Sequence, residues 1–249
     1  MRLYRYFLDS VPYYLARYYW WAYLWRPAIW FFDHQPVINA ILFGQYKALM
    51  QATLARLEGV ASGNVLQLTC VYGLLTPKLI NQIAPRALHV ADVSQAQLEL
   101  ARSKQPVPAS VIAARMNAEN LSYRDNAFST IVIFFLLHEM PREARRATLS
   151  ECLRVLSPGG TLVLTEYAPL PRKHFLYRTA PFRALLTRLE PFLESYWQED
   201  LLSLLVTLGG SRGKSAEVVD HALIFDGFYR VTEFRTVNAG VPLSGRIPT

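Results

Sequence analysis

Residues 65–73, Val-Leu-Gln-Leu-Thr-Cys-Val-Tyr-Gly, decide the fold of this chain. The stretch starts as an apolar strand, turns sharply, and leads into the helical pattern of residues 74–84. A second apolar strand, residues 87–91, follows that helix and ends in Asp92. Strand, tight turn, helix, strand and terminal carboxylate form the first unit of a nucleotide-binding α/β domain. In such a unit the helix N-terminus faces the ligand, and the acid is expected to bind ribose hydroxyls.

The turn departs from the usual pattern, in which several glycines let the backbone approach the ligand closely. Only Gly73 remains here, and Thr69, Val71 and Tyr72 take the other places. Val71 is expected to act sterically, by keeping the backbone away from the ligand. Tyr72 either packs under the turn or contacts a ligand, and the sequence leaves both readings open.

Length and composition limit the possible classes of protein. The chain has 249 residues, a net charge of +7 and a sequence pI near 9.5. This charge suits an anionic surface, either a membrane or a nucleic acid. Two cysteines form no disulfide framework, which favours a reducing cytosol. We expect no membrane-spanning helix, since no apolar run reaches about 18 residues, and no signal peptide, since Asp9 and Pro12 interrupt the apolar start.

The first 32 residues are rich in aromatic side chains and contain four of the five tryptophans, with Arg2, Arg5, Arg17 and Arg26 between them. One interpretation is a helical appendage that packs its rings on the domain. The other is an interfacial segment, or a lid over an apolar ligand, because Tyr and Trp favour boundaries between apolar and aqueous surroundings. The aromatic residues are Tyr4, Tyr6, Phe7, Tyr13, Tyr14, Tyr18, Tyr19, Trp20, Trp21, Tyr23, Trp25, Trp30, Phe31 and Phe32.

The remaining chain alternates between strands and helices. The continuous apolar run 128–137 predicts a central parallel strand that is buried on both faces. The helix predicted at 142–156 is expected to expose Arg142, Arg145 and Arg146. Further predicted elements are helices at 37–57 and 95–104, strands at 111–114 and 161–167, amphipathic helical pieces at 182–193 and 201–208, and an antiparallel pair at 221–225 and 229–236.

Alternating strands and helices followed by a terminal hairpin predict an α/β fold with a doubly wound, mostly parallel seven-stranded sheet. We expect an aromatic helical N-terminal extension at 1–58 and one ligand-binding domain at 59–249, with a helical insertion at 169–208. The extension and the insertion are expected to cover the carboxyl edge of the sheet, where ligands bind. The segment 209–215 looks like a phosphate-binding loop, but its spacing is wrong and it follows a helical piece.

The order of these motifs resembles that of class I S-adenosylmethionine-dependent methyltransferases, which have a Rossmann-like fold. The resemblance covers about residues 60–167, and its most specific part is the stretch Arg-Val-Leu-Ser-Pro-Gly-Gly at 154–160. It implies a S-adenosylmethionine site. The residues that it assigns to this site are Gln67, Cys70, Val71, Tyr72, Gly73, Asp92, Val93, Asn117 and Ala118.

Within that superfamily, nearly the whole chain is similar to the rhodoquinone biosynthesis methyltransferase-like family, RquA. The shared stretches are Tyr-Trp-Trp-Ala-Tyr at 19–23, Cys-Val-Tyr-Gly at 70–73, Phe-Phe-Leu-Leu-His-Glu at 134–139 and the segment 223–229. The resemblance implies conversion of ubiquinone to rhodoquinone, in which an amino group from S-adenosylmethionine replaces a methoxy group. It also implies a divalent metal, with Mn²⁺ preferred. From the aromatic, arginine-bearing head and the amphipathic pieces at 169–208, we expect a cytoplasmic protein that binds peripherally to the inner membrane and has no nucleic-acid partner.

The catalytic candidates are Tyr72, His138 and Glu139. His138 either caps the strand edge or serves as a general base or metal ligand; no His spacing locates a metal site. Cys70 is expected to be a small buried residue rather than a nucleophile. Gln67 replaces the acid that usually holds the methionine amino group, so a strong charge-assisted bond is lost.

Two further departures, Asn117 in place of an Asp and Ser129 in place of an Asp, affect the expected adenine contacts.

Three functional hypotheses follow. The first is the amino-for-methoxy exchange on ubiquinone. The alternative is a conventional S-adenosylmethionine-dependent methyltransferase that acts on a prenylated quinone or another lipid. The third is a non-catalytic descendant that binds lipid or protein. The substituted turn favours the first or the third hypothesis over the second.

Overall fold

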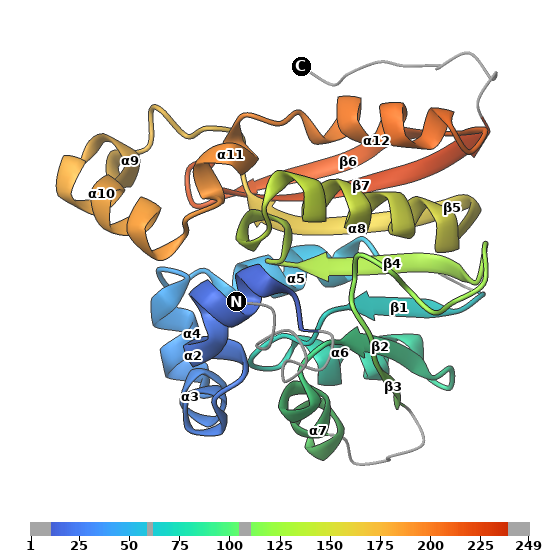
Figure 1. Cartoon of the computed structure of the whole chain (residues 1–249), viewed down its shortest axis with the longest axis horizontal. Helices are drawn as coiled ribbons and strands as arrows, with labels where there is room; N and C mark the ends of the chain where they lie inside the picture. Colours follow the sequence, from blue (N-terminus) through green and yellow to red (C-terminus); the bar gives the residue numbers. More distant parts are fainter. Residues whose placement is uncertain (1–10, 59–61, 105–110, 239–249) are drawn as a thin grey trace.

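The computed structural model describes residues 11–58, 62–104 and 111–238. Its centre is one seven-stranded sheet in the order β3-β2-β1-β4-β5-β7-β6 (Figure 1). The doubly wound, mostly parallel sheet predicted from the sequence is confirmed. The strands are β1 (Val65–Leu68), β2 (Leu88–Asp92), β3 (Val111–Arg115), β4 (Phe128–Phe134), β5 (Leu156–Tyr167), β6 (Lys214–Ile224) and β7 (Tyr229–Asn238).

The parallel part of the sheet places the ends of its strands side by side. All four residues of β1 are buried, as expected for a strand that is covered on both faces. In the register of the sheet, Leu68 of β1 lies beside Ala91 of β2 and Ile133 of β4. The residues that directly follow these three strands therefore meet at one edge of the sheet.

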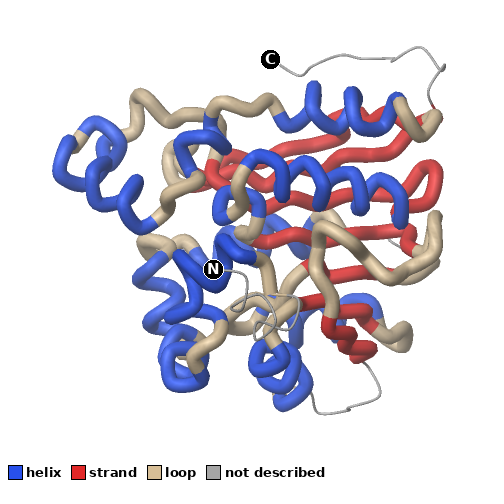
Figure 2. Tube along the Cα trace, viewed as in Figure 1, coloured by secondary structure: helices blue, strands red, loops and turns tan. Residues whose placement is uncertain are grey.

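Helices cover both faces of the sheet. Figure 1 shows α8 and α12 in front of it and α5 behind it, and Figure 2 shows the same two-sided arrangement of helices around strands. The helices are α2 (Trp20–Tyr23), α3 (Arg26–Phe32), α4 (Gln35–Ile41), α5 (Tyr46–Ala55), α6 (Leu75–Ile83), α7 (Gln95–Ser103), α8 (Arg142–Val155), α9 (Phe175–Arg178), α10 (Ala180–Leu189), α11 (Leu193–Trp197) and α12 (Leu201–Gly210).

The N-terminal helices and α9–α10 gather at the carboxyl edge of the parallel strands, on the left in Figure 1. This is the edge that the sequence predicted they would cover. The predicted aromatic residues Tyr4, Tyr6 and Phe7, and also Arg2 and Arg5, lie outside the described residues. In the part of the chain that the structure describes, no helix is long and apolar enough to cross a membrane.

The helix predicted at 37–57 is wrong as one element, because the structure divides it into α4 and α5. Phe43 and Gly44 have φ values of 51° and 79°, and the Gly44 N–H donates to the Asn39 carbonyl at 2.7 Å. A left-handed pair of residues with such a capping bond ends a helix. Hydrophobic periodicity continues across this break, so the pattern did not reveal it.

Two predicted strand boundaries also differ from the structure. The run 128–137 ends as a strand at Phe134, because Phe135 has a φ of 55° and a 3₁₀ turn, Leu137–Glu139, follows. The strand predicted at 161–167 begins earlier, at Leu156, and its pairing with β4 shifts register between Phe128 and Thr130. Apolar composition alone could not locate either boundary.

The terminal antiparallel pair is confirmed and is longer than predicted, since β6 begins at Lys214. The buried Lys214 ammonium donates to the Leu153 carbonyl at 2.7 Å and to Asn126 Oδ1 at 2.8 Å. The segment 209–215 therefore joins α12 to β6, and its lysine binds the protein's own oxygen atoms. This placement agrees with the prediction that the segment is not a phosphate-binding loop.

Candidate active site at the carboxyl edge of the sheet

A cavity of about 300 Å³ lies at the carboxyl ends of β1, β2 and β4. Residues that follow these strands form one side of the cavity, and the N-terminal helices and the end of α10 form the other. The N-terminal helices contribute the apolar side chains of Leu15, Trp21, Phe32, Ile38, Ile41 and Leu42. A mostly apolar cavity that contains a few convergent polar groups is the usual form of a small-molecule site.

Most of the residues predicted to bind a cofactor line this cavity. The turn after β1 contributes Cys70, Val71 and Tyr72, the end of β2 contributes Asp92 and Val93, and the segment after β3 contributes Asn117 and Ala118. The structure thus brings together seven of the nine predicted positions. Their role in cofactor binding stays a prediction.

Both carboxylate oxygens of Asp92 accept hydrogen bonds from backbone N–H groups. Oδ2 accepts from the Cys70 backbone N–H at 2.8 Å, and Oδ1 accepts from the Ser94 N–H at 2.7 Å. Burial raises the pKa of this carboxyl to about 6, although the two backbone donors oppose that rise. A carboxylate oxygen has two lone pairs, so Asp92 can still accept hydrogen bonds from a ligand in the cavity.

Gln67 and Gly73 do not line the cavity. Gln67 is fully buried, and its Nε2 donates to the Thr69 carbonyl at 2.9 Å. Thr69 has a φ of 42°, which is uncommon for a β-branched residue and costs about 1–3 kcal/mol. The amide of Gln67 therefore supports a strained turn.

Gly73 faces the N-terminal helices. Its N–H donates to Asp33 Oδ1 at 2.8 Å, and Lys104 forms an ion pair with the same carboxylate. A Cβ at this position would come within 2.6 Å of the Tyr46 hydroxyl and even closer to Gln35 Nε2. With its φ of 79°, Gly73 is required so that the N-terminal extension can lie directly on the turn.

Tyr72 lines the cavity and is held by the N-terminal segment. Its hydroxyl donates to the Ala22 carbonyl, and its ring stacks on Tyr23 with the centroids 6.0 Å apart. Phe32 packs at 5.9 Å from the same ring. Tyr72 therefore packs against the N-terminal segment and also lines the cavity, and its contact with a ligand stays a prediction.

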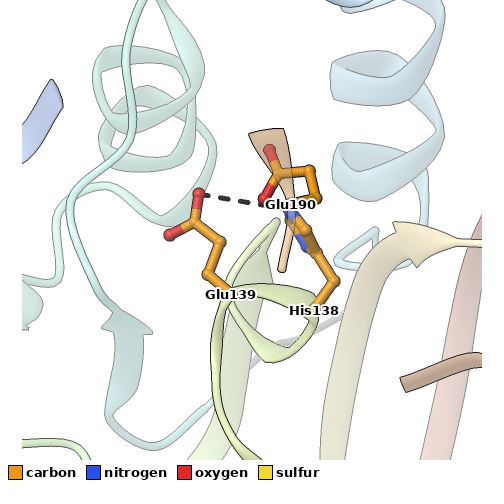
Figure 3. A group of neighbouring side chains, drawn as sticks. All are labelled: His138, Glu139 and Glu190. Atoms are coloured by element: carbon orange, nitrogen blue, oxygen red, sulfur yellow. Dashed lines mark ion pairs between the residues drawn. The ribbon is translucent and has the colours of Figure 1, made fainter. Parts of the chain in front are cut away.

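His138 and Glu139 lie on the 3₁₀ turn after β4, and Glu190 reaches them from the end of α10 (Figure 3). His138 Nε2 lies 4.0 Å from Glu139 Oε1 and 3.8 Å from Glu190 Oε2. Glu190 is a site residue that the sequence did not reveal. It lies far from His138 along the chain, and no local motif surrounds it.

Glu166, at the end of β5, holds the turn that carries His138. Its Oε1 accepts from the Leu136 and Leu137 N–H groups at 2.8 and 2.6 Å, and its Oε2 lies 2.7 Å from His138 Nδ1. Because Nδ1 then carries a proton, Nε2 is the nitrogen that faces Glu139 and Glu190. This contact fixes the orientation of the imidazole.

The electrostatic balance of this cluster is unusual. Burial lowers the pKa of His138, but Glu166, Glu190 and Glu139 outweigh it and raise that pKa to about 9. Burial raises the pKa of Glu139 to about 8, and it raises the pKa of Glu190 as well. Strongly shifted titratable groups in a cavity are typical of functional sites.

Three tyrosines of the N-terminal segment donate to acidic side chains, two of which, Glu139 and Glu190, line the cavity. A π-helix, Leu15–Tyr19, brings residues five apart to one face of this segment. The aromatic composition drew attention to the segment, but its spacing did not indicate the acidic partners. The pairs are Tyr14 with Glu119 (3.2 Å), Tyr19 with Glu190 (2.9 Å) and Tyr23 with Glu139 (2.5 Å).

The predicted exposure of Arg145 is wrong, whereas Arg142 and Arg146 are exposed as expected. Arg145 is fully buried, and its guanidinium donates to the Leu137 and Met140 carbonyls at 2.9 Å each. It also forms an ion pair with Glu199. Arg145 therefore joins the turn that carries His138 to the segment after α11.

Comparison with known proteins agrees with this geometry. Residues 65–160 match the family model described as a methyltransferase domain. The demethylmenaquinone methyltransferase of Lactiplantibacillus plantarum is 34% identical over 132 residues, which are 51% of this chain and 55% of that protein. The ubiquinone/menaquinone biosynthesis C-methyltransferase UbiE of Pseudomonas putida is 30% identical over 137 residues, which are 53% of each. The chain thus spans about half the length of these curated relatives.

Solved structures show the same fold. The [4+2]-cyclase SpnF superposes with a TM-score of 0.57 at 18% identity, covering 86% of this chain and 97% of that one. The N-methyltransferase NodS of Bradyrhizobium japonicum, solved with S-adenosyl-L-homocysteine, has a TM-score of 0.53 at 19% identity and covers 83% and 90%. The fold is that of the class I S-adenosylmethionine-dependent methyltransferases. One of these neighbours is named as a cyclase, so the fold alone does not fix the reaction.

Proposed function

We propose that this chain is a S-adenosylmethionine-dependent transferase that modifies the ring of an isoprenoid quinone. One observation carries the proposal: a single cavity brings together Asp92 at the end of β2, an apolar aromatic wall and the buried His138–Glu139 pair. The partial matches to quinone methyltransferases support the quinone as substrate. Incorporation of a labelled atom from S-adenosylmethionine into a quinone tests the proposal.

Methyl transfer is the reaction that the names of the matched relatives favour. The methyl group leaves the sulfonium for a nucleophilic carbon or oxygen of the reduced ring, and the ring releases one proton. His138 and Glu139 border the space where the ring would lie, and each can accept that proton only in its deprotonated form. S-adenosylhomocysteine and the methylated quinol are then the products.

Exchange of a methoxy group for an amino group is the second candidate, and the turn after β1 favours it. Thr69 and Val71 place β-branched side chains along the cavity, at positions where glycines normally let the methionine moiety settle. A displaced amine can attack the electrophilic ring, and the methoxy group then leaves as methanol with the proton that the nitrogen releases. Isomerisation of this adduct to a quinol imine, followed by hydrolysis with water, breaks the bond between the nitrogen and the methionine Cα and gives the aminoquinol and a 2-oxo acid. The resemblance to the rhodoquinone family implies this route and a divalent cation, preferably Mn²⁺.

Asp92 provides the test of the cofactor site. Replacement Asp92→Ala removes a charged acceptor for ribose hydroxyls, which is worth about 1.5–3 kcal/mol. We expect S-adenosylmethionine affinity, measured by calorimetry, to fall by roughly ten- to a hundredfold. Asp125→Ala is the control. It removes an exposed carboxylate that pairs with Arg154 outside the cavity, and it should leave the affinity for S-adenosylmethionine unchanged. Unchanged affinity in a folded Asp92→Ala protein refutes the assignment.

We also propose that the rim around the cavity, residues 11–32 and 172–189, binds an anionic membrane surface. The rim carries seven Arg and Lys residues and no Asp or Glu. The rest of the chain contains nineteen Arg and Lys residues and nineteen Asp and Glu residues. Its exposed apolar side chains include Trp25, Trp30 and Leu185, each more than half exposed. Basic charge interleaved with exposed aromatics is the pattern of an interfacial surface.

The membrane proposal predicts that the full chain sediments with anionic vesicles at low salt and is released as salt rises. Replacing both Trp25 and Trp30 by Ala should weaken binding at least about tenfold, because burying one large apolar side chain contributes about 1.5–3 kcal/mol. Ile112→Ala, at an exposed position on β3 away from the rim, is the control. No sedimentation of the native chain, or undiminished binding by the double variant, contradicts the proposal.

A further inference from the structure

We infer that His138, Glu139 and Glu190 form a binding site for one divalent metal cation in the cavity wall (Figure 3). One ligand atom from each side chain lies within 4.8 Å of the other two. Ligand atoms around a small cation, each about 2.1 Å from it, lie about 3–4 Å apart. Small side-chain rotations therefore suffice to bring all three onto one ion.

The charge of the cluster favours a cation. Three largely buried carboxylates, those of Glu139, Glu166 and Glu190, contact the single imidazole of His138. Even a protonated imidazole balances only one of them. Buried charges in proteins are normally paired or coordinate a metal. A divalent cation would offset the negative charge that these groups carry when they are ionised.

The second layer of contacts arranges all three side chains toward one point. Glu166 holds His138 through Nδ1, so Nε2 faces the two carboxylates. Within the described chain, no hydrogen bond reaches Nε2 of this buried side chain, which lies 4.0 Å from Glu139 Oε1 and 3.8 Å from Glu190 Oε2. The Tyr23 hydroxyl donates to Glu139, and the Tyr19 hydroxyl donates to Glu190. A carboxylate behind a histidine is the usual support of a metal-ligating imidazole.

All three side chains also line the cavity, so a bound cation would be open to a ligand there. Carboxylates with one imidazole suit Mn²⁺ and related divalent ions. Such an ion can polarise a carbonyl oxygen. It also occupies the Nε2 lone pair, so His138 then serves as a ligand and not as a proton acceptor. This catalytic role depends on the proposed function, whereas cation binding does not.

Mn²⁺ binding to the full-length, chelator-treated protein tests the site without any substrate. We expect electron paramagnetic resonance of free Mn²⁺ to show one ion bound per chain, and Mn²⁺ to raise the melting temperature. Glu190→Gln should weaken Mn²⁺ binding at least about tenfold. Removing even a group that only supports a metal ligand typically lowers metal affinity about 10- to 100-fold. Glu194→Gln, the same change at an exposed position in the same insertion, should bind as the native protein does.

A native chain that binds no Mn²⁺, or a folded Glu190→Gln protein that binds it with native affinity, overturns the site. If Glu190→Gln does not fold, Glu139→Gln is judged by the same criterion. This experiment contains neither S-adenosylmethionine nor quinone. A negative result would therefore overturn the metal site but not the proposed reaction, which the labelling experiment tests separately.

Discussion

Arg145→Met is expected to lower the free energy of unfolding by about 3–5 kcal/mol, because it removes one partner of a buried ion pair. Glu199 is left without its guanidinium, and the Leu137 and Met140 carbonyls lose their donors. The ring of Tyr196, 5.2 Å from the guanidinium carbon, loses a cation–π contact as well. Urea denaturation followed by circular dichroism measures the change.

Arg146→Met is the matched control for this prediction. It makes the same substitution at the next residue of α8, where the side chain is exposed, and should change stability by less than about 0.5 kcal/mol. The same effect from both variants, or a loss below about 1 kcal/mol for Arg145→Met, would show that Arg145 does not hold the turn that carries His138.

The sequence predicted the sheet because its central strands are buried on both faces and must be almost continuously apolar. The strand at β1, the turn and Asp92 follow one another closely, so local pattern located the edge of the sheet at which the cavity lies. Local pattern failed where one backbone angle decides the outcome. Gly44 and Phe135 both have positive φ angles. Gly44 divides a helix and Phe135 ends a strand, and hydrophobic periodicity does not reveal such backbone angles.

The candidate site was predicted only where its residues follow strands. His138 and Glu139 do so, and the structure places them in the cavity wall. Glu190 and Tyr19 come from helices outside the sheet, and their pairing depends on how the insertion and the extension fold back over it. Arg145 shows the same limit, since helical spacing suggested a solvent-facing side chain, whereas in the structure it is buried between the turn after β4 and α11.

The central claim is that an atom of S-adenosylmethionine moves to a quinone in this cavity. The direct measurement uses purified full-length chain, Mn²⁺, a soluble ubiquinone analogue in its oxidised or reduced form, and S-adenosylmethionine labelled in separate runs. One run carries heavy carbon at the methyl group, and the other carries heavy nitrogen at the amine. Mass spectrometry of the extracted quinone then follows each label.

We expect one of the two labels to enter the quinone, and Asp92→Ala to reduce its rate of entry. Heavy carbon identifies a methyltransferase, and heavy nitrogen with loss of a methoxy group identifies the amino exchange. If neither label enters the quinone while calorimetry shows that the same protein binds S-adenosylmethionine and the quinone analogue, the proposed transferase function is contradicted.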